Sequence, residues 1–244
     1  MGMARASKHP EERRQEFIEA AEALFLEKGY QGTSVSDIVD RVGVAHGLFY
    51  YYFDSKEDLL DAIIEGMVRE SRRRLEAIVD GDGTPLEKYH RFVQQMFVLK
   101  KDKPYLIGYM LQERNRLFYH KWMQRSLNEI TPMLADIVEQ GVAIGCFDTE
   151  YPREAVEFIF NGMRFFLSAP EELQGEALRT KMLAAGDMME RVLGAEPESI
   201  TSMYREILPG VLDMMDESMR FVEEKAMQMR ADTSKPATTE GGLP

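Results

Sequence analysis

Residues 33–56, TSVSDIVDRVGVAHGLFYYYFDSK, decide the fold of this chain. After a hydroxyl-bearing start, apolar residues recur at helical spacing over residues 33–42, which predicts a short helix with one buried face. Gly43 follows, where a helix commonly ends in a left-handed backbone conformation that glycine adopts at low cost. A second short helix is predicted from Ala45 to Phe53. Two short helices joined by a glycine turn form a helix-turn-helix, whose second helix can enter the major groove of DNA.

The rest of the chain is typical of an all-α protein. Apolar residues recur at three and four residues, and no segment keeps the alternation of a β-strand. Further helices are predicted at 12–28, 56–79, 85–101, 104–115, 117–145, 153–168, 171–193 and 199–230. Pro132 should kink or divide one of these helices, and Pro209 with Gly210 should bend or break the last.

The charge of the chain opposes general binding to nucleic acid. The net charge is −12, and residues 1–56 alone hold 7 Lys or Arg against 9 Asp or Glu. Arg5, Lys8, Arg13 and Arg14 nevertheless give the N-terminus a basic arm that can contact phosphates. We therefore expect modest non-specific affinity for DNA.

Signals of secretion, membrane insertion and catalysis are missing from the sequence. One cysteine, no apolar run of bilayer length and no secretory leader favour the cytoplasm. The four histidines lack the spacing of metal ligands, and no nucleophile motif or phosphate-binding glycine loop occurs. We expect no enzyme activity, no catalytic residues, no metal and no cofactor.

The segment Phe17–Ile63 resembles the N-terminal domain of the tetracycline-repressor (TetR) family of transcriptional regulators. The matching residues are AxxLFxxKGY at 21–30, TSV at 33–35, DI at 37–38, GV at 43–44, GLFYYYF at 47–53 and SKEDLL at 55–60. A weaker similarity is the GxxxGxF pattern at 141–147, which often precedes the dimerisation helices of this family. The resemblance implies an all-helical homodimer that binds a palindromic operator in double-stranded DNA and is released by a small ligand.

The resemblance also implies which residues contact DNA. They are Thr33, Ser34, Ser36, Ala45, His46, Gly47, Leu48, Tyr50, Tyr51 and Lys56. Residues 45–48 would face base edges, while the two tyrosines, Lys56 and either Thr33 or Ser34 would meet phosphates; Ser36 lies where some members of the family carry arginine. Tyr52 could serve either the core or a phosphate.

Three regions follow from these patterns and the resemblance. Residues 1–56 are expected to form the DNA-binding domain with its basic arm, and residues 57–230 a helical domain for effector binding and dimerisation. Residues 231–244 are expected to be a disordered tail because they are rich in Thr, Gly and Pro and lack an apolar period.

Aromatic and methionine stripes in residues 57–230 are mostly core, but polar side chains among them indicate an effector site. The candidates are Phe92, Met96, Tyr109, Arg114, Phe118, Trp122, Asn161, Arg164 and Phe165. A salt bridge from Arg164 to Glu113 or Glu157 is favoured over a ligand carboxylate. The ligand alternative would suit an apolar anion such as a fatty or aromatic acid.

The helix around residue 160 is apolar on two faces, so we expect it to pack on its own chain and on a second subunit. The helix at 199–230 would either pack on the effector domain or extend the dimer interface. The leading hypothesis is a dimeric repressor released by a largely apolar effector. The alternative is a helical adaptor whose helix-turn-helix binds protein instead of DNA.

Overall fold

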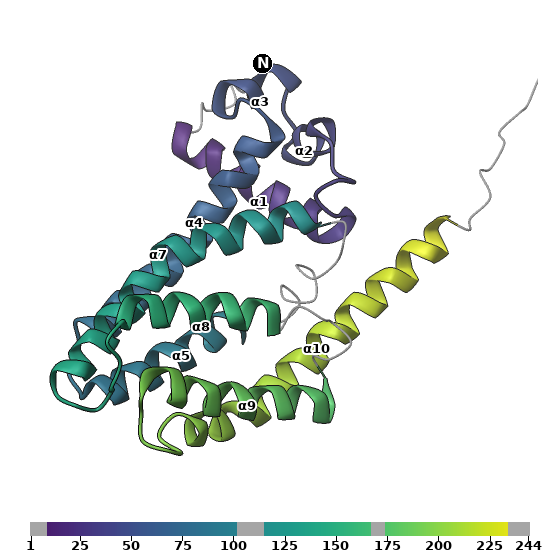
Figure 1. Cartoon of the computed structure of the whole chain (residues 1–244). Helices are drawn as coiled ribbons and strands as arrows, with labels where there is room; N and C mark the ends of the chain where they lie inside the picture. The colour runs from purple at the N-terminus through teal and green to yellow at the C-terminus, as the bar shows by residue number, and fades with distance from the viewer. Residues whose placement is uncertain (1–8, 102–114, 167–173, 234–244) are drawn as a thin grey trace, which may run out of the picture.

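The computed structural model of the protein describes residues 9–101, 115–166 and 174–233, and in these ranges it contains helices and no strand (Figure 1). The helices are α1 (Pro10–Lys28), α2 (Val35–Val42), α3 (His46–Tyr52), α4 (Lys56–Val79), α5 (Pro85–Lys101), α7 (Arg116–Ala143), α8 (Pro152–Phe166), α9 (Gly175–Leu193) and α10 (Thr201–Thr233). This arrangement confirms the all-α prediction of an N-terminal helix-turn-helix followed by a larger helical part.

Local sequence sets the ends of the helix-turn-helix. Ser34 caps α2 by accepting a hydrogen bond from the Asp37 amide, while the Asp37 carboxylate accepts one from the Ser34 amide. Gly43 ends α2 with a φ of 73°, in the left-handed region. Ser55 caps α4 by accepting from the Asp58 amide.

One hydrophobic core joins α1, α2, α3 and the first half of α4. The buried ring of Phe17 on α1 meets Phe49 and Phe53 edge-on, with ring centroids 5.7 and 6.2 Å apart. Removing an aromatic ring from such a core costs about 3–5 kcal/mol. Phe118 of α7 is buried in the same core, so a helix outside the helix-turn-helix completes it.

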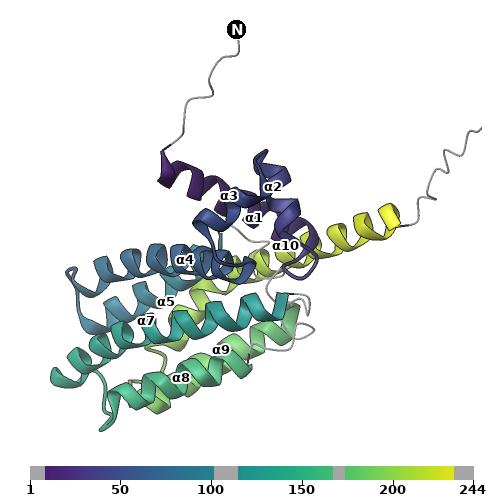
Figure 2. The same ribbon diagram turned by 90° about the horizontal axis from the view of Figure 1, so that it is seen from above.

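A second core lies among α5, α7, α8, α9 and the first half of α10. Helices α4, α5 and α7 each contact the other two and lie close together in Figure 2, and contacts continue from α7 to α8, from α8 to α9 and from α9 to α10. The buried Phe147 ring packs against Gly141 so closely that a side chain there would overlap it. This close approach gives the GxxxGxF pattern a physical reason.

Pro132 lies inside the continuous helix α7, and Pro209 lies inside α10. Neither helix is divided at its proline, and the alternative prediction of a kink or bend stays untested. Both prolines are exposed, so their rings do not disturb a packed interface.

The C-terminal half of α10 extends away from the other helices in both views (Figures 1 and 2). Helix α10 includes residues 231–233, which were expected to belong to the disordered tail; the rest of that tail lies outside the described residues. The helix expected at 104–115 also lies outside them, except for Asn115. Among the described helices, none combines the length and the apolar character that a membrane span requires.

Candidate nucleic-acid interface and ligand cavity

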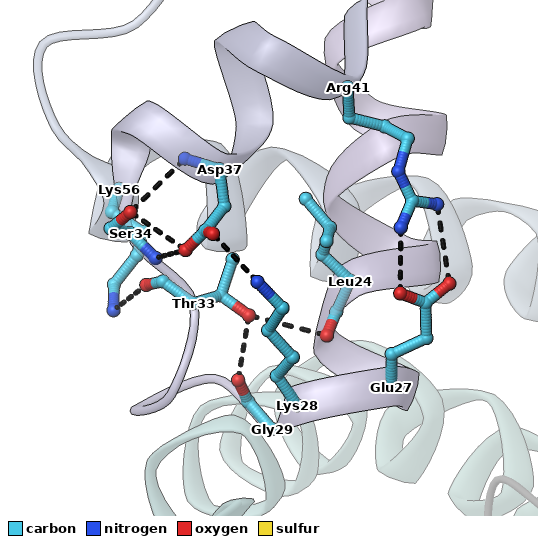
Figure 3. Close-up of polar contacts among 9 residues, drawn as sticks. All are labelled: Leu24, Glu27, Lys28, Gly29, Thr33, Ser34, Asp37, Arg41 and Lys56. Carbon is cyan, nitrogen blue, oxygen red and sulfur yellow. Dashed lines mark hydrogen bonds and ion pairs between the residues drawn. The ribbon is translucent and has the colours of Figure 1, made fainter. Parts of the chain in front are cut away.

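The N-terminus of α2 is held by a network of polar side chains (Figure 3). The Asp37 carboxylate accepts from the Ser34 amide and hydroxyl and from Lys28 Nζ, at 2.8, 2.7 and 2.6 Å. The Lys28 and Ser34 hydrogen bonds hold the pKa of Asp37 well below its usual range. The Ser34 hydroxyl therefore serves the cap, although its residue is exposed.

Thr33 and Lys56 both make hydrogen bonds within the chain, and the phosphate contacts expected of them stay a prediction. The Thr33 side chain is 1% exposed, and its hydroxyl donates to the carbonyls of Leu24 and Gly29. The Lys56 ammonium donates to the carbonyls of Tyr30 and Thr33 at 2.8 and 2.7 Å. Burial lowers the pKa of Lys56, and Asp37 opposes that effect. Both side chains fix the loop between α1 and α2.

Helix α3 presents an exposed face built from most of its predicted contact residues. Ala45, His46 and Gly47 are exposed, and so are Tyr50 and Tyr51, at 53% and 74%. Ala45 caps α3 without a side-chain hydrogen bond, so no capping side chain accepts from the first amides of the helix. Such amides favour a phosphate oxygen or a base acceptor.

The remaining candidates divide between surface and core. Ser36 is exposed in the first turn of α2. Leu48 and Tyr52 are half-buried against the N-terminal core, and the Tyr52 ring lies 5.8 Å from that of Phe17. Tyr52 is therefore mainly a packing residue.

Gly47 is a glycine that the folded chain does not require. A methyl group added at its Cα would meet no atom within 4 Å, and its φ lies outside the left-handed region. Glycine inside a helix costs about 0.5–1 kcal/mol relative to alanine. The position is thus open toward the surroundings, where a binding partner could approach the backbone.

The described cations of residues 9–56 already have partners within the chain. Arg41 makes a two-point contact with Glu27 at 3.2 and 2.7 Å, and Arg13 pairs with Glu16. Arg14 lies 5.0 Å from the centroid of the Phe53 ring. An anion that approaches these cations therefore competes with the partners that they have within the chain.

A cavity of about 620 Å³ lies between the two cores. Its walls come from α1, α4, α5, α7, α8, α9 and α10, and include Ile18 of α1, Met67 of α4 and Met163 of α8. Methionine is flexible and polarisable, so it adapts to apolar ligands of different shapes. The volume and the apolar lining are typical of a small-molecule site.

Three of the predicted effector residues, Met96, Trp122 and Arg164, line this cavity. Phe92 and Phe118 are not among the lining residues; Phe92 packs in the second core and Phe118 in the core shared with the helix-turn-helix.

Two other candidates point elsewhere. Phe165 is 74% exposed, and the exposed Asn161 side chain donates to the Glu157 carbonyl. Tyr109 and Arg114 lie outside the described residues.

Arg164 makes no ion pair with any carboxylate in the described ranges. Its guanidinium lies 5.5 Å from the centroid of the Phe165 ring. The salt bridge predicted to Glu157 is absent from the structure, and Glu113 lies outside the described residues. Burial raises the pKa of the nearby Tyr119 hydroxyl, while Arg164 opposes the rise. Arg164 is therefore a half-buried positive charge at the cavity wall.

Sequence reasoning missed the inner wall of the cavity. Tyr89, Met189 and Tyr204 line it, and both tyrosine hydroxyls donate to Met189 Sδ at 3.3 Å. The pattern of each helix marks these residues only as core, because they come from three helices that meet in space. The part played by α1 was missed for the same reason.

The start of α7 connects the cavity with the helix-turn-helix. Buried Asn115 accepts a hydrogen bond from the Tyr30 amide at 3.2 Å, which joins α7 to the loop after α1. Lys121 pairs with Glu57 and Asp61 of α4 at 2.7 and 2.8 Å. Tyr119, one turn after Asn115, and Trp122, which follows Lys121, line the cavity.

Known proteins match both parts of the chain. Residues 17–63 match the family described as "Bacterial regulatory proteins, tetR family", and residues 108–184 match "Tetracyclin repressor-like, C-terminal domain". The HTH-type transcriptional repressor KstR2 of Mycobacterium tuberculosis is 28% identical over 148 residues, which are 59% of this chain and 74% of that protein.

Solved structures agree with these matches. A transcriptional regulator of the TetR/AcrR family from Thermobifida fusca is 30% identical, with a TM-score of 0.53 over 75% of this chain and 96% of the other. FadR from Bacillus subtilis, solved with stearoyl-CoA, shares the fold at 22% identity and a TM-score of 0.55, over 73% of this chain and 97% of that one. The chain therefore belongs to the TetR family of transcriptional regulators.

Proposed function

We propose that this regulator is a homodimeric repressor in the cytoplasm, which binds a palindromic operator and is released by a small, largely apolar effector. The observation that carries the proposal is that one cavity is bounded by the helices of the second core and also by α1 of the helix-turn-helix domain. A molecule in this cavity contacts the DNA-binding unit directly. If the effector binds more tightly when α1 is in a different position, operator affinity must fall by the same factor.

Operator contacts are assigned to the exposed face of α3. Residues 45–48 would face base edges, with the exposed part of Leu48 against a thymine methyl group. The hydroxyls of Tyr50 and Tyr51 would donate to phosphates, together with Ser36 from α2. Thr33, Ser34 and Lys56 would hold the loop and the start of α2 in place.

The second subunit is expected on the outer face of α8. Phe158 and Phe165 are 69% and 74% exposed there, although Val156 and Ile159 on the opposite face are buried. Gly162 lies between the exposed rings with open space at its Cα. Met188 of α9 is 54% exposed and would join α8 in a four-helix interface across a two-fold axis. Covering these rings removes a large apolar surface from water.

The cavity favours an apolar effector, and Arg164 favours one with an anionic group. A half-buried guanidinium that pairs with no carboxylate of the described ranges gains stability from an anion that enters beside it. Fatty and aromatic acids combine an apolar body with such a group. Arg164→Gln should therefore weaken the binding of these acids more than that of the corresponding neutral amides.

The test is fluorescence anisotropy on labelled DNA from immediately upstream of the coding sequence, measured across a salt series. Saturable binding that exceeds binding to random DNA by about a thousandfold or more would support the operator proposal. Affinity should also fall as salt rises, because phosphate contacts release counterions. Equal binding to both DNAs would contradict it for this site and favour the adaptor hypothesis.

A further inference from the structure

Two buried tyrosines donate to one sulfur atom at the inner wall of the cavity. The hydroxyl of Tyr89 on α5 and that of Tyr204 on α10 each lie 3.3 Å from Sδ of Met189 on α9. The two tyrosines are 0% and 2% exposed, and Met189 is 5% exposed. All three residues line the cavity.

Two buried hydroxyl groups that share one weak acceptor are energetically unfavourable if the two tyrosines serve only in packing. A thioether sulfur is a weak acceptor, and here a single sulfur serves two donors. A buried hydroxyl without a strong partner costs free energy that a phenylalanine ring would not. Burial raises the pKa of both tyrosines, so each remains a protonated donor at neutral pH.

The geometry suits an incoming oxygen atom. Two donors that converge on one point match a carbonyl oxygen, which has two lone pairs. The wall beside them is apolar and includes Met182, Met214 and Met215. A charged carboxylate would lose its hydration in such surroundings, whereas a neutral carbonyl would lose much less. Met189 has three rotatable bonds and can move aside.

We propose that the effector carries a neutral carbonyl oxygen at its buried end, and that Tyr89 and Tyr204 both donate to this oxygen. The inference rests on the proposed function, because it assumes that the cavity is the effector site. It adds a chemical requirement to the apolar body proposed above.

The probe for this inference is prodan, 6-propionyl-2-(dimethylamino)naphthalene. It is an apolar ketone whose emission shifts to the red when the carbonyl accepts hydrogen bonds. Two hydrogen bonds of ordinary strength correspond to about a thirtyfold change in affinity. We expect Tyr89→Phe/Tyr204→Phe to bind prodan about thirtyfold more weakly than the unmodified protein, with blue-shifted emission of the bound dye.

Controls separate hydrogen bonding from folding and from shape. 2-(Dimethylamino)naphthalene lacks the carbonyl and should bind both proteins equally. Tyr151→Phe, at an exposed residue outside the cavity lining, should bind prodan as the unmodified protein does. Each single variant should lose about fivefold. Without ligand, the melting temperature of the double variant should equal or exceed that of the unmodified protein, because only weak O–H···S bonds are removed.

Equal prodan affinity and equal emission in the unmodified protein and in the single and double variants would overturn the inference. So would the absence of saturable prodan binding to the unmodified protein. Operator titration of the same preparations tests the proposed function separately. If the protein binds its operator but has equal affinity for the two dyes, the proposed function is supported and this inference is wrong. If the protein binds prodan more tightly than the second dye but binds no operator, this inference is supported and the proposed function is wrong.

Discussion

Gly47→Ala separates the requirements of the fold from those of DNA binding. The added methyl group meets no atom of the folded chain within 4 Å, and residue 47 is helical. Alanine should therefore stabilise the protein by about 0.5–1 kcal/mol, which raises the melting temperature of a chain of this size by about 1–4 °C. If α3 enters the major groove as proposed, the same methyl group lies between the helix and the base edges.

The expected loss of operator affinity is larger than the gain in stability. Forcing a methyl group into a packed interface costs about 1–3 kcal/mol, and a dimer contains two such sites. The total of about 2–6 kcal/mol corresponds to at least a thirtyfold weaker operator complex. Thermal unfolding and operator anisotropy on the same sample measure both effects.

Gly210→Ala is the matched control, because Gly210 is exposed and open in α10, far along the chain from α3. It should also stabilise the protein, without changing operator affinity. If Gly47→Ala stabilised the protein and bound the operator within twofold of the unmodified protein, the start of α3 would not lie against the bases.

Four further changes test other parts of the molecule. Tyr50→Phe removes one proposed phosphate donor per subunit and should weaken operator binding about tenfold or more without changing the melting temperature; an unchanged titration would remove Tyr50 from the contacts. Phe158→Glu places a charge on the proposed dimer face and should give monomers in sedimentation velocity, whereas a persistent dimer would locate the interface elsewhere. Asn115→Ala leaves the buried Tyr30 amide without its acceptor and should lower the free energy of unfolding by about 1–3 kcal/mol in denaturant titration; no loss would show that water replaces the side chain. Glu190→Gln should destabilise the protein at pH 7, because Glu190 accepts from the amides of Ile200 and Thr201. Burial opposes the charged form of Glu190, but these hydrogen bonds outweigh it and lower its pKa, so the stabilisation is present above the unfolded pKa of about 4.3 and is lost as pH falls through the lower folded value. The two proteins should then converge in acid, and a constant difference would contradict this assignment.

Sequence predicted the helix-turn-helix well because its signals are local. Ser34, Gly43 and Ser55 each act within one turn of their own position, through a cap or a left-handed φ. The outcomes for Thr33 and Lys56 could not be predicted in this way. Both depend on the path of the loop after Gly29, which places backbone carbonyls within reach of the two side chains.

The sequence predicted that a cavity would be apolar, but it did not predict which residues line the cavity. Methionine and aromatic stripes indicated an apolar site, yet the same stripes also describe the core. Tyr89, Met189 and Tyr204 come together only when α5, α9 and α10 pack, and no helical period of one segment contains that information. Phe118 shows a different error. Its apolar stripe predicted an effector contact, but its side chain is buried in the core of the helix-turn-helix.

If the cavity is the effector site as proposed, the packing of α1 would couple a bound ligand to the DNA-binding helices. Ile18 and neighbouring residues of α1 line the cavity, while Phe17, one position earlier, lies in the core with Phe49 of α3. The ion pair between Arg41 and Glu27 also joins α1 to α2 (Figure 3). Exposed pairs add little stability by themselves, but the shared core makes independent movement of these helices costly. On this proposal, a ligand that displaced α1 would displace α2 and α3 with it, so the contacts of α1 alone would suffice for the coupling.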